Sequence, residues 1–357
     1  MEHKKIIKVL IVEDSHLMCK VLTDVLNSDP HIIVVGVANN GKDAFNLAKN
    51  LKPDIITMDI HMPIMDGIEA TELIMAYIPT PILIISSTAP KTGQGGVFDA
   101  ISNGALDFQE KKGIEYYSNN INRKQLIEKV KYLSRIKVIT HPKGKSVNKK
   151  YKKSTPTKKY KPAQLNTTRS VSVDKVVAIA SSTGGTNAIA AILQSLPANL
   201  PCAIVMVQHL TSGFDADFAN WLDSKCVLKV KIAEDSEIIR PGTVYLAPTD
   251  FQTRISSRRR FTITEEPSLN GHCPSGDILL NSAANVYRTN AVGLILTGMG
   301  KDGAEGIKMI HDNKGKTIAQ DEKSCVIFGM PKAAIDLNAA DYVLPLDKIA
   351  EKIIELV

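Results

Sequence analysis

The stretch KVLIVEDSHLMCKVLTDVL, residues 8–26, joins a run of apolar, mostly β-branched residues to a segment whose apolar residues recur every three to four positions. The first part is typical of a buried strand and the second of an amphipathic helix. Strand-like runs return at 32–37, 54–58 and 81–85. Because strands that alternate with helices favour a parallel sheet covered on both faces, the pattern predicts an α/β domain over residues 8–136.

The same alternation starts again after Lys175. VVAIA at 176–180 precedes a predicted helix near Thr186, AIVMV follows at 203–207, and AVGLILT at 291–297 precedes another helix at 303–311. A chain of 357 residues, 44% of them hydrophobic, can bury two cores. We therefore predict a second α/β domain.

Between the two domains lies a strongly basic segment. Residues 137–169 contain eleven Lys or Arg and no Asp or Glu, so the rest of the chain carries a net charge of −4 although the whole carries +7. The segment is rich in Lys, Ser, Thr and Pro and lacks apolar periodicity, which predicts an exposed linker.

Other features bound the cellular context. No run of about eighteen apolar residues occurs, and MEHKKIIKVL at the start leads into a strand rather than a signal-peptide apolar region. We expect a cytoplasmic protein without membrane insertion. The five cysteines are widely spaced and form no CxxC pair, which favours reduced, structural thiols over disulfides or a zinc site.

Acidic residues follow two strands of the first predicted sheet. Glu13 and Asp14 follow its first strand and Asp59 its third. The carboxyl ends of parallel strands meet at one edge, so the three carboxylates are expected to converge. Mg²⁺ prefers such oxygen ligands and would offset their repulsion, while Asp59 could attack phosphorus as a nucleophile.

Two later strand ends add to this site. Ser86 follows PILII and Lys111 follows ALDFQE, and a hydroxyl and an ammonium there could contact phosphoryl oxygens. Any one of the acidic positions alone could equally be a solvated loop residue.

EDS at 13–15, MDIHMPIMDG at 58–67, SS at 86–87 and Lys111 resemble the receiver domain of two-component response regulators. The resemblance implies a flavodoxin-like, five-stranded parallel sheet with Asp59 as the phosphoryl acceptor. It also implies that Glu13, Asp14 and Asp59 bind Mg²⁺. Ser86 would be the switch hydroxyl, and Lys111 the base that contacts the phosphate. Lys112 stands where receivers commonly have Pro, which leaves open which lysine points inward.

A small-residue turn, Ser181-Ser182-Thr183-Gly184-Gly185-Thr186, joins the first strand of the second domain to its helix. Such a turn brings backbone N–H groups near an oxyanion, but alone it could equally bind phosphate. His209 follows the next strand as a candidate general base, although a lone histidine there is more often structural. Asp302 follows a third strand and could orient His209.

SSTGG at 181–185, QH at 208–209 and LTGMGKDGAEG at 296–306 resemble the catalytic domain of chemotaxis protein-glutamate methylesterases, the CheB family. EDSEIIRPGTVYLAP, GHCPSGDILL and SCVIFGMP extend the resemblance. It implies a Rossmann-like doubly wound domain whose nucleophile, base and third triad member are Ser182, His209 and Asp302.

Further roles follow from the same resemblance. Thr183 and Met299 would lie beside the nucleophile, with the Met299 N–H as an oxyanion donor, and His272 and Asp277 would be structural or line the pocket. Ala180-Ser181 stands where Gly-Ala is common, and Cys273 where Arg is common. The adjacent serines make the choice of Ser182 depend on the family pattern.

The combined expectation is a receiver domain (1–136), a basic linker (137–173) and a methylesterase domain (174–357). Phosphorylation by a chemotaxis histidine kinase, with Mg²⁺, would activate hydrolysis of glutamate methyl esters on chemoreceptors, and the ester chemistry, like deamidation of glutamines, would need no cofactor. The alternatives are a DNA-binding response regulator, a non-catalytic adaptor and a hydrolase of another ester. Nucleic-acid binding is not expected, because no helix-turn-helix pattern accompanies the basic segment.

Overall fold

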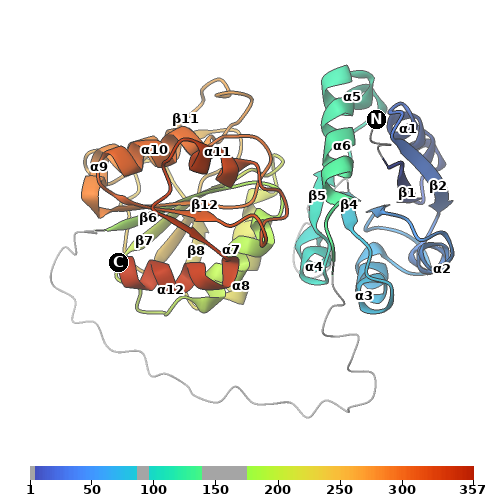
Figure 1. The fold of residues 1–357 in the computed structure, drawn as a ribbon, viewed down its shortest axis with the longest axis horizontal. Helices are drawn as coiled ribbons and strands as arrows, with labels where there is room; N and C mark the ends of the chain where they lie inside the picture. The colour runs from blue at the N-terminus through green and yellow to red at the C-terminus, as the bar shows by residue number, and fades with distance from the viewer. Residues whose placement is uncertain (1–4, 87–95, 139–174) are drawn as a thin grey trace, which may run out of the picture.

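The structure is a computed structural model that describes residues 5–86, 96–138 and 175–357. Two parallel sheets, each with helices on both faces, form an N-terminal and a C-terminal domain (Figure 1). The predicted fold class is confirmed for both. The predicted linker lies outside the described residues except for Lys137 and Val138.

The N-terminal sheet has five parallel strands in the order β2-β1-β3-β4-β5, which is the flavodoxin-like order. Alternate strand residues point to opposite faces: Leu10 and Val12 pack toward α2, α3 and α4, whereas Val9 and Ile11 pack toward α1, α5 and α6. The elements are β1 (Ile7–Val12), α1 (His16–Asn27), β2 (Ile32–Ala38), α2 (Gly41–Leu51), β3 (Ile55–Met58), α3 (Gly67–Tyr77), β4 (Ile82–Ser86), α4 (Val97–Ser102), β5 (Asp107–Glu110), α5 (Ile114–Ser118) and α6 (Asn120–Leu133).

The C-terminal sheet has seven parallel strands in the order β14-β13-β12-β6-β7-β9-β8. Helices α7, α8 and α12 cover one face, and α9, α10 and α11 cover the other (Figure 1). Strands β10 and β11 form a separate two-stranded antiparallel sheet in the same domain. The elements of the domain are β6 (Val176–Ser181), α7 (Gly185–Ser195), β7 (Ala203–Gln208), α8 (Asp215–Lys225), β8 (Lys229–Ile232), β9 (Thr243–Leu246), β10 (Gln252–Ile255), β11 (Phe261–Thr264), α9 (Gly276–Tyr287), the 3-10 helix η2 (Arg288–Asn290), β12 (Ala291–Ile295), α10 (Ala304–Asp312), β13 (Lys316–Gln320), α11 (Met330–Asp336), β14 (Tyr342–Leu344) and α12 (Leu346–Leu356).

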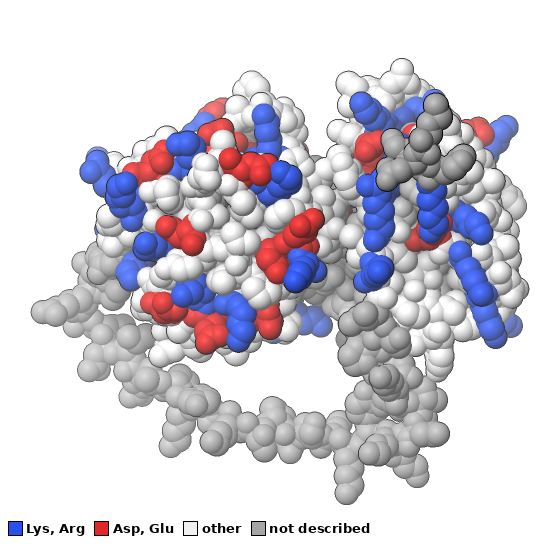
Figure 2. Space-filling model, viewed as in Figure 1, with Lys and Arg blue, Asp and Glu red and all other residues white. Residues whose placement is uncertain are grey.

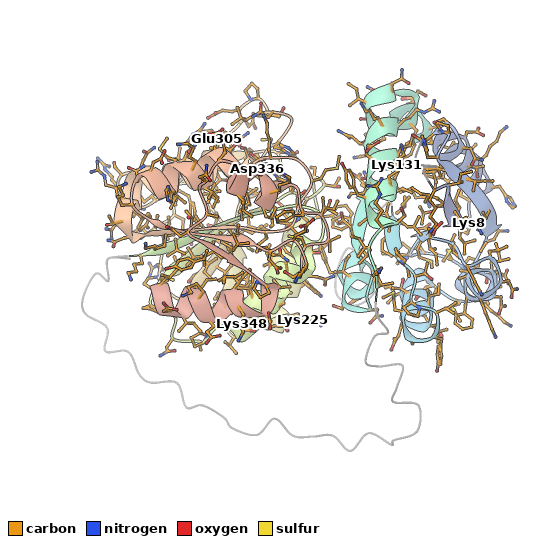
Figure 3. The ribbon with its side chains drawn as sticks, in the orientation of Figure 1. Lys8, Lys131, Lys225, Glu305, Asp336 and Lys348 are labelled. Atoms are coloured by element: carbon orange, nitrogen blue, oxygen red, sulfur yellow. The ribbon has the colours of Figure 1, made fainter. Side chains whose placement is uncertain are left out.

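The outer helix faces of this domain are charged. Glu305, Asp336, Lys225 and Lys348 come from four helices and point away from the sheet (Figure 3). On the face shown in Figure 2, acidic and basic side chains are interspersed over the C-terminal domain. None of the helices in the described part of the chain has the length and hydropathy of a transmembrane segment.

Aromatic side chains join the two domains. Phe98 of α4 lies 5.2 Å from Phe218 and 5.7 Å from Trp221 between ring centroids, and Phe108 of β5 lies 4.9 Å from Phe214. The Trp221 indole N–H also donates to the Ser102 hydroxyl at 3.2 Å. Aromatic pairs at such distances attract one another beyond their buried area, so α4 and β5 form a specific contact with α8 and the loop before it.

Candidate active site

The carboxyl ends of β6, β7 and β12 meet where the strand order of the C-terminal sheet reverses, a usual place for ligands in open α/β sheets. Ser182 follows β6, and His209 follows β7. Because Ser181 pairs in register with Gln208, Ser182 and His209 lie on adjacent strand ends. Asp302 lies in the loop after β12, so all three predicted residues lie at the same edge of the sheet.

His209, which is partly buried, pairs with the buried Asp302. His209 Nε2 lies 2.8 Å from Asp302 Oδ2. The carboxylate can only accept, so Nε2 carries the ring proton and Nδ1 has the free lone pair. His209 Nδ1 is buried and has no hydrogen-bond partner among the described residues. One nitrogen is therefore fixed and the other is available to a substrate or nucleophile.

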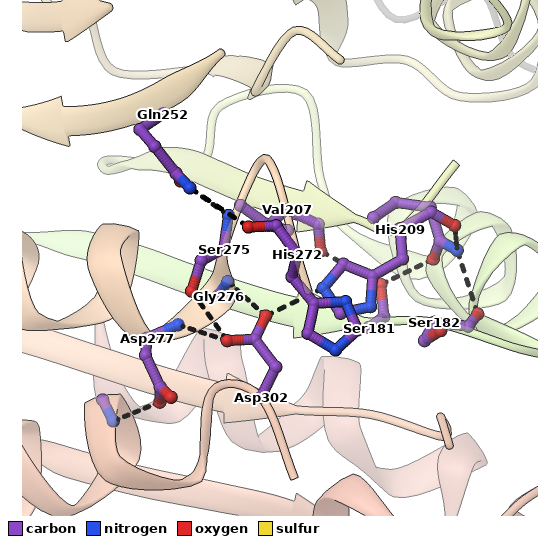
Figure 4. Close-up of polar contacts among 12 residues, drawn as sticks. Ser181, Ser182, Val207, His209, Gln252, His272, Ser275, Gly276, Asp277 and Asp302 are labelled. Atoms are coloured by element: carbon purple, nitrogen blue, oxygen red, sulfur yellow. Dashed lines mark hydrogen bonds and ion pairs between the residues drawn. The ribbon is translucent and has the colours of Figure 1, made fainter. Parts of the chain in front are cut away.

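The Asp302 carboxylate lies at the N-terminus of α9. It accepts from the Ser275 hydroxyl at 2.7 Å, the Gly276 N–H at 2.6 Å and the Asp277 N–H at 3.2 Å (Figure 4). Burial alone would raise the pKa of Asp302, but the His209 bond and these donors hold that pKa well below its usual range. Asp302 is thus ionised at neutral pH.

Gly276 allows this approach. A Cβ at position 276 would lie 2.8 Å from the Ala180 Cβ and 3.2 Å from Asp302 Oδ2. A larger residue would push α9 away from the carboxylate. The glycine therefore lets the first turn of α9 donate directly to Asp302.

His272 stacks on His209, with ring centroids 4.1 Å apart and planes within 6° of parallel. Burial lowers the pKa of His272, and the neighbouring His209 lowers it further, which favours a neutral ring. His209, His272 and Asp302 could in principle share a metal ion. However, the in-plane lone pairs of stacked rings lie in two separate, nearly parallel planes and do not converge on one ion, so this arrangement suits stacking better than chelation.

The two adjacent serines differ in environment. Ser181 is fully buried, and its hydroxyl donates to Gln208 Oε1 at 2.7 Å. Ser182 is half-buried, and two backbone hydrogen bonds fix its position. Its N–H donates to the Thr297 carbonyl at 3.1 Å, and its carbonyl accepts from the Gly185 N–H at 2.7 Å. Of the two hydroxyls, only that of Ser182 lies at the accessible sheet edge.

The turn after β12 packs against the Ser182 turn. A Cβ at Gly298 would lie 2.8 Å from the Ser182 Cβ, which brings the next residue, Met299, beside Ser182. Met299 is 37% exposed, and its N–H has no acceptor among the described residues. The Thr183 carbonyl accepts from the Thr297 hydroxyl at 3.0 Å, which ties the two turns together.

The carboxyl edge of the N-terminal sheet brings together Glu13, Asp59 and Lys111. Lys111 Nζ lies 2.7 Å from Glu13 Oε1 and 2.6 Å from Asp59 Oδ2. Lys112 instead points away from Asp59 and pairs with the partly buried Glu110 at 2.5 Å. The structure thus answers the question of the two lysines: Lys111 points inward.

This edge fits a hard cation. Oxygen atoms of Glu13, Asp14 and Asp59 lie within 4.8 Å of one another, with Asp14 exposed. Glu13 Oε2 and the Ser86 hydroxyl are buried without a hydrogen-bond partner among the described residues. Burial, reinforced by Asp59, raises the pKa of Glu13 despite the Lys111 bond. Mg²⁺ would relieve this unfavourable burial of charge.

Several contributing residues were not found from the sequence: Gln208, Ser275, Gly276 and Thr297. Ser275 and Gly276 precede Asp302 by more than 25 positions, so their contact depends on how α9 packs. The only local signal was the glycine beside Asp277 in the GHCPSGD motif.

Comparisons with known proteins agree with both domains. Residues 177–353 match the family model of the CheB methylesterase, and residues 9–115 match that of the response regulator receiver domain. A Nitrosospira multiformis protein named "Protein-glutamate methylesterase/protein-glutamine glutaminase" is 39% identical over 98% of this chain and 97% of its own length. A Thermotoga maritima protein of the same name is 40% identical over 99% of both chains.

A solved structure is also similar. The catalytic domain of the Thermotoga maritima CheB methylesterase is 45% identical, with a TM-score of 0.50, and the match covers 51% of this chain and 98% of that one.

Proposed function

This chain belongs to the family of chemotaxis protein-glutamate methylesterases with a receiver domain, and we propose that Ser182, His209 and Asp302 are its catalytic triad. It is a carboxylic ester hydrolase. The proposed substrates are methylated glutamates of chemoreceptors, together with receptor glutamines, whose amides react through a similar oxyanion. The observation that carries the triad is the partly buried His209–Asp302 pair, in which Nδ1 has no partner among the described residues and His209 follows the strand next to that of Ser182.

In the proposed mechanism, Ser182 Oγ attacks the ester carbonyl carbon while its proton passes to His209 Nδ1. The tetrahedral adduct expels the methoxy group, which takes that proton and leaves as methanol. Water then attacks the acyl-enzyme, giving one proton to His209, which returns it to Ser182 as the C–O bond to the serine breaks. The glutamic acid product departs and loses its remaining acidic proton to solvent. Asp302 remains ionised and stabilises the imidazolium.

The tetrahedral adduct carries an oxyanion that needs donors. The Met299 N–H is the proposed donor, since it lies beside Ser182 and has no acceptor among the described residues. Thr183 shapes the same turn. One such donor contributes about 10²–10³ in kcat in a serine hydrolase.

The test is methanol release from methylated chemoreceptor membranes. Ser182→Ala should lower kcat at least about 10³-fold, because triad residues act as a unit. Ser181→Ala removes the neighbouring hydroxyl and should keep at least roughly a tenth of the activity, since that hydroxyl is buried against Gln208. Full methanol release by Ser182→Ala would refute the triad.

We further propose that Asp59 accepts a phosphoryl group from a chemotaxis histidine kinase, with Mg²⁺ held by Glu13, Asp14 and Asp59. When bound, the ion would neutralise charge on the phosphoryl oxygens. Lys111 already contacts Asp59 and would bind one of those oxygens, and the Ser86 hydroxyl, which has no partner in the described part of the chain, would bind another. A cluster of buried, incompletely satisfied oxygens supports this assignment.

The receiver is proposed to restrain the esterase until it is phosphorylated. Val326 packs against the core of the receiver, and it also touches the nucleophile turn, because a Cβ at Gly184 would lie 2.5 Å from the Val326 Cβ. A phosphoryl group with a charge of about −1.5 to −2 in place of the single carboxylate charge of Asp59 could shift the aromatic contact of α4 and β5. The receiver would then expose the site.

Two variants test this control. Asp59→Ala should abolish stimulation by a small phosphoryl donor with Mg²⁺ and leave basal methanol release unchanged. Phe98→Ala, which weakens the aromatic contact, should raise basal release, as should the isolated segment 170–357. A segment slower than the unphosphorylated full chain would refute steric restraint.

A further inference from the structure

The Gln208 side chain contacts both proposed catalytic turns. It is buried, its Oε1 accepts from the Ser181 hydroxyl at 2.7 Å, and its Nε2 donates to the carbonyls of Ser182 at 2.9 Å and His209 at 3.0 Å. Both amide hydrogens and the amide oxygen are therefore used. Gln208 joins the backbone of the nucleophile to that of the base.

The two carbonyls fix the orientation of this amide. If the amide were flipped, Oε1 would face two carbonyl oxygens without a hydrogen between them, which is repulsive. The Ser181 hydroxyl also lies 3.4 Å from the Val207 carbonyl, but Oε1 is the nearer acceptor at 2.7 Å and receives its proton. Ser181 thus completes the hydrogen bonding of a group that is too deeply buried to bond water.

Backbone bonds extend the connection. The His209 N–H donates to the Ser181 carbonyl at 3.0 Å, and the Gly185 N–H shares the Ser182 carbonyl with Gln208. Gly185 is also held close, because a Cβ there would lie 2.2 Å from Gln208 Oε1. The ends of β6 and β7 and the turn after β6 are therefore held together by contacts with the Gln208 side chain.

We infer that Ser181 and Gln208 form a positioning pair that sets the distance and angle between Ser182 and His209 during ester hydrolysis. The inference rests on the proposed triad. Neither side chain touches the reacting atoms, so both are positioning rather than catalytic residues. Misplacing reacting groups by about 1 Å can cost about 10²-fold in rate, so this backbone lock governs kcat.

The two residues of the pair should differ in how much they affect kcat. Gln208 makes two bonds to catalytic backbone, whereas Ser181 acts on that backbone through Gln208 and occupies a position where the family commonly has Ala. Losing Ser181 leaves one buried amide oxygen without its donor, but the Nε2 bonds remain. Its removal is therefore the milder perturbation.

The experiment compares full-length variants by methanol release and thermal unfolding. Gln208→Met keeps the length of the side chain without its hydrogen bonds, and should lower kcat about 100-fold with KM within about twofold. Ser181→Ala should lower kcat about 3- to 10-fold. Thr317→Val is the matched control: it removes buried hydrogen bonds to Asp341 at the opposite end of β13 and should keep the wild-type kcat.

A second readout is the rate at which a fluorophosphonate labels Ser182. It should fall in parallel with kcat in Gln208→Met and Ser181→Ala but not in Thr317→Val. Wild-type kcat and labelling in Gln208→Met, or an equal loss in the control, would overturn the inference. If Gln208→Met does not fold, Ser181→Ala decides by the same two measurements.

The labelling rate also separates this inference from the proposed function. If the wild type releases no methanol from receptors, the substrate assignment fails, yet slower labelling of Ser182 in both variants still supports the positioning pair. Methanol release that survives Ser182→Ala refutes the triad and the positioning pair together.

Discussion

The two sheet edges hold carboxylates in opposite ways. At the C-terminal edge, Asp302 accepts hydrogen bonds from His209 and from three donors at the start of α9, and its pKa is lowered. At the N-terminal edge, Glu13 and Asp59 share Lys111, one oxygen of Glu13 has no partner among the described residues, and burial raises the pKa of Glu13. Among the described residues, the Asp302 carboxylate is hydrogen-bonded through both oxygens, whereas the Glu13 carboxylate is not.

This difference is consistent with a catalytic role for one edge and a regulatory role for the other. A satisfied carboxylate stabilises developing positive charge without rearranging, which suits a catalytic site. An unsatisfied cluster gains from a cation and changes its bonding when charge is added, which suits a switch. The same topology thus gives a rigid site and a responsive site, depending on how many donors face the strand ends.

The largest effect should come from Asp302→Asn. The amide cannot balance the imidazolium and favours the wrong ring tautomer, so we expect kcat for methanol release to fall about 10³- to 10⁴-fold. Phosphorylation of the receiver by a small phosphoryl donor should be unchanged, because Asp302 belongs to the other edge. Incorporation of a labelled phosphoryl group into the receiver domain checks that phosphorylation is unchanged.

Ser275→Ala is the graded control for Asp302. It removes one donor and leaves the others, so kcat should fall about tenfold, the worth of one hydrogen bond to a charged group. Equal losses in both variants would mean that the α9 N-terminus is needed for folding rather than for holding the carboxylate.

The next effect concerns Mg²⁺. Any ligand that binds only the folded state stabilises it, by about 2.7 kcal/mol at a hundredfold excess over Kd. Wild type should therefore melt at a higher temperature with Mg²⁺, and Glu13→Gln should lose this shift. Asp302→Asn should keep it. A full Mg²⁺ shift in Glu13→Gln would remove Glu13 from the proposed ligands.

The sequence was sufficient to predict the fold class and the convergence of sites at strand ends. Buried parallel strands must be apolar and end in polar residues, so Glu13, Asp59, His209 and Asp302 stand out. Contacts between distant segments were not predictable. The stack of His272 on His209 and the bonds of Gln208 depend on strand register and helix packing, which one sequence does not specify.

The choice between Lys111 and Lys112 illustrates the same limit. Both follow β5, and alternation along a strand puts neighbours on opposite sides, but the sequence does not say which side is which. The pairing of Ser86 with Glu110 in the sheet sets the register. That register turns Lys111 toward Asp59.

A smaller effect is expected in the dependence of stability on pH, where Asp302 and Glu13 should contribute with opposite signs. A lowered folded-state pKa makes Asp302 stabilise the fold above its usual 3.8, and this contribution is lost as the pH falls below that value. A raised folded-state pKa makes Glu13 do the reverse: the folded state binds the proton more tightly, so stability rises as the pH falls from neutral toward 4.5.

Melting temperatures between pH 7 and pH 3 check these signs. The difference in stability between wild type and Glu13→Gln should shift in favour of wild type as the pH falls from 7 toward 4.5. The difference between wild type and Asp302→Asn should shift against wild type as the pH falls below 3.8. The same sign for both differences would contradict the contrast between the two edges.

The smallest effect should come from Lys112→Ala. The Lys112–Glu110 pair is partly exposed, with 38% of the lysine and 18% of the glutamate side chain accessible, and pairs near the surface contribute about 0–1 kcal/mol. Stability should change by no more than about 0.5 kcal/mol and the rate of phosphorylation by no more than about twofold. Lys111→Ala is the comparison, because it leaves Glu13 and Asp59 without their shared cation, and it should slow phosphorylation well beyond that range. If Lys112→Ala were the more damaging variant, the inward lysine would be misassigned, and the N-terminal edge would not be the unsatisfied cluster that distinguishes it from Asp302.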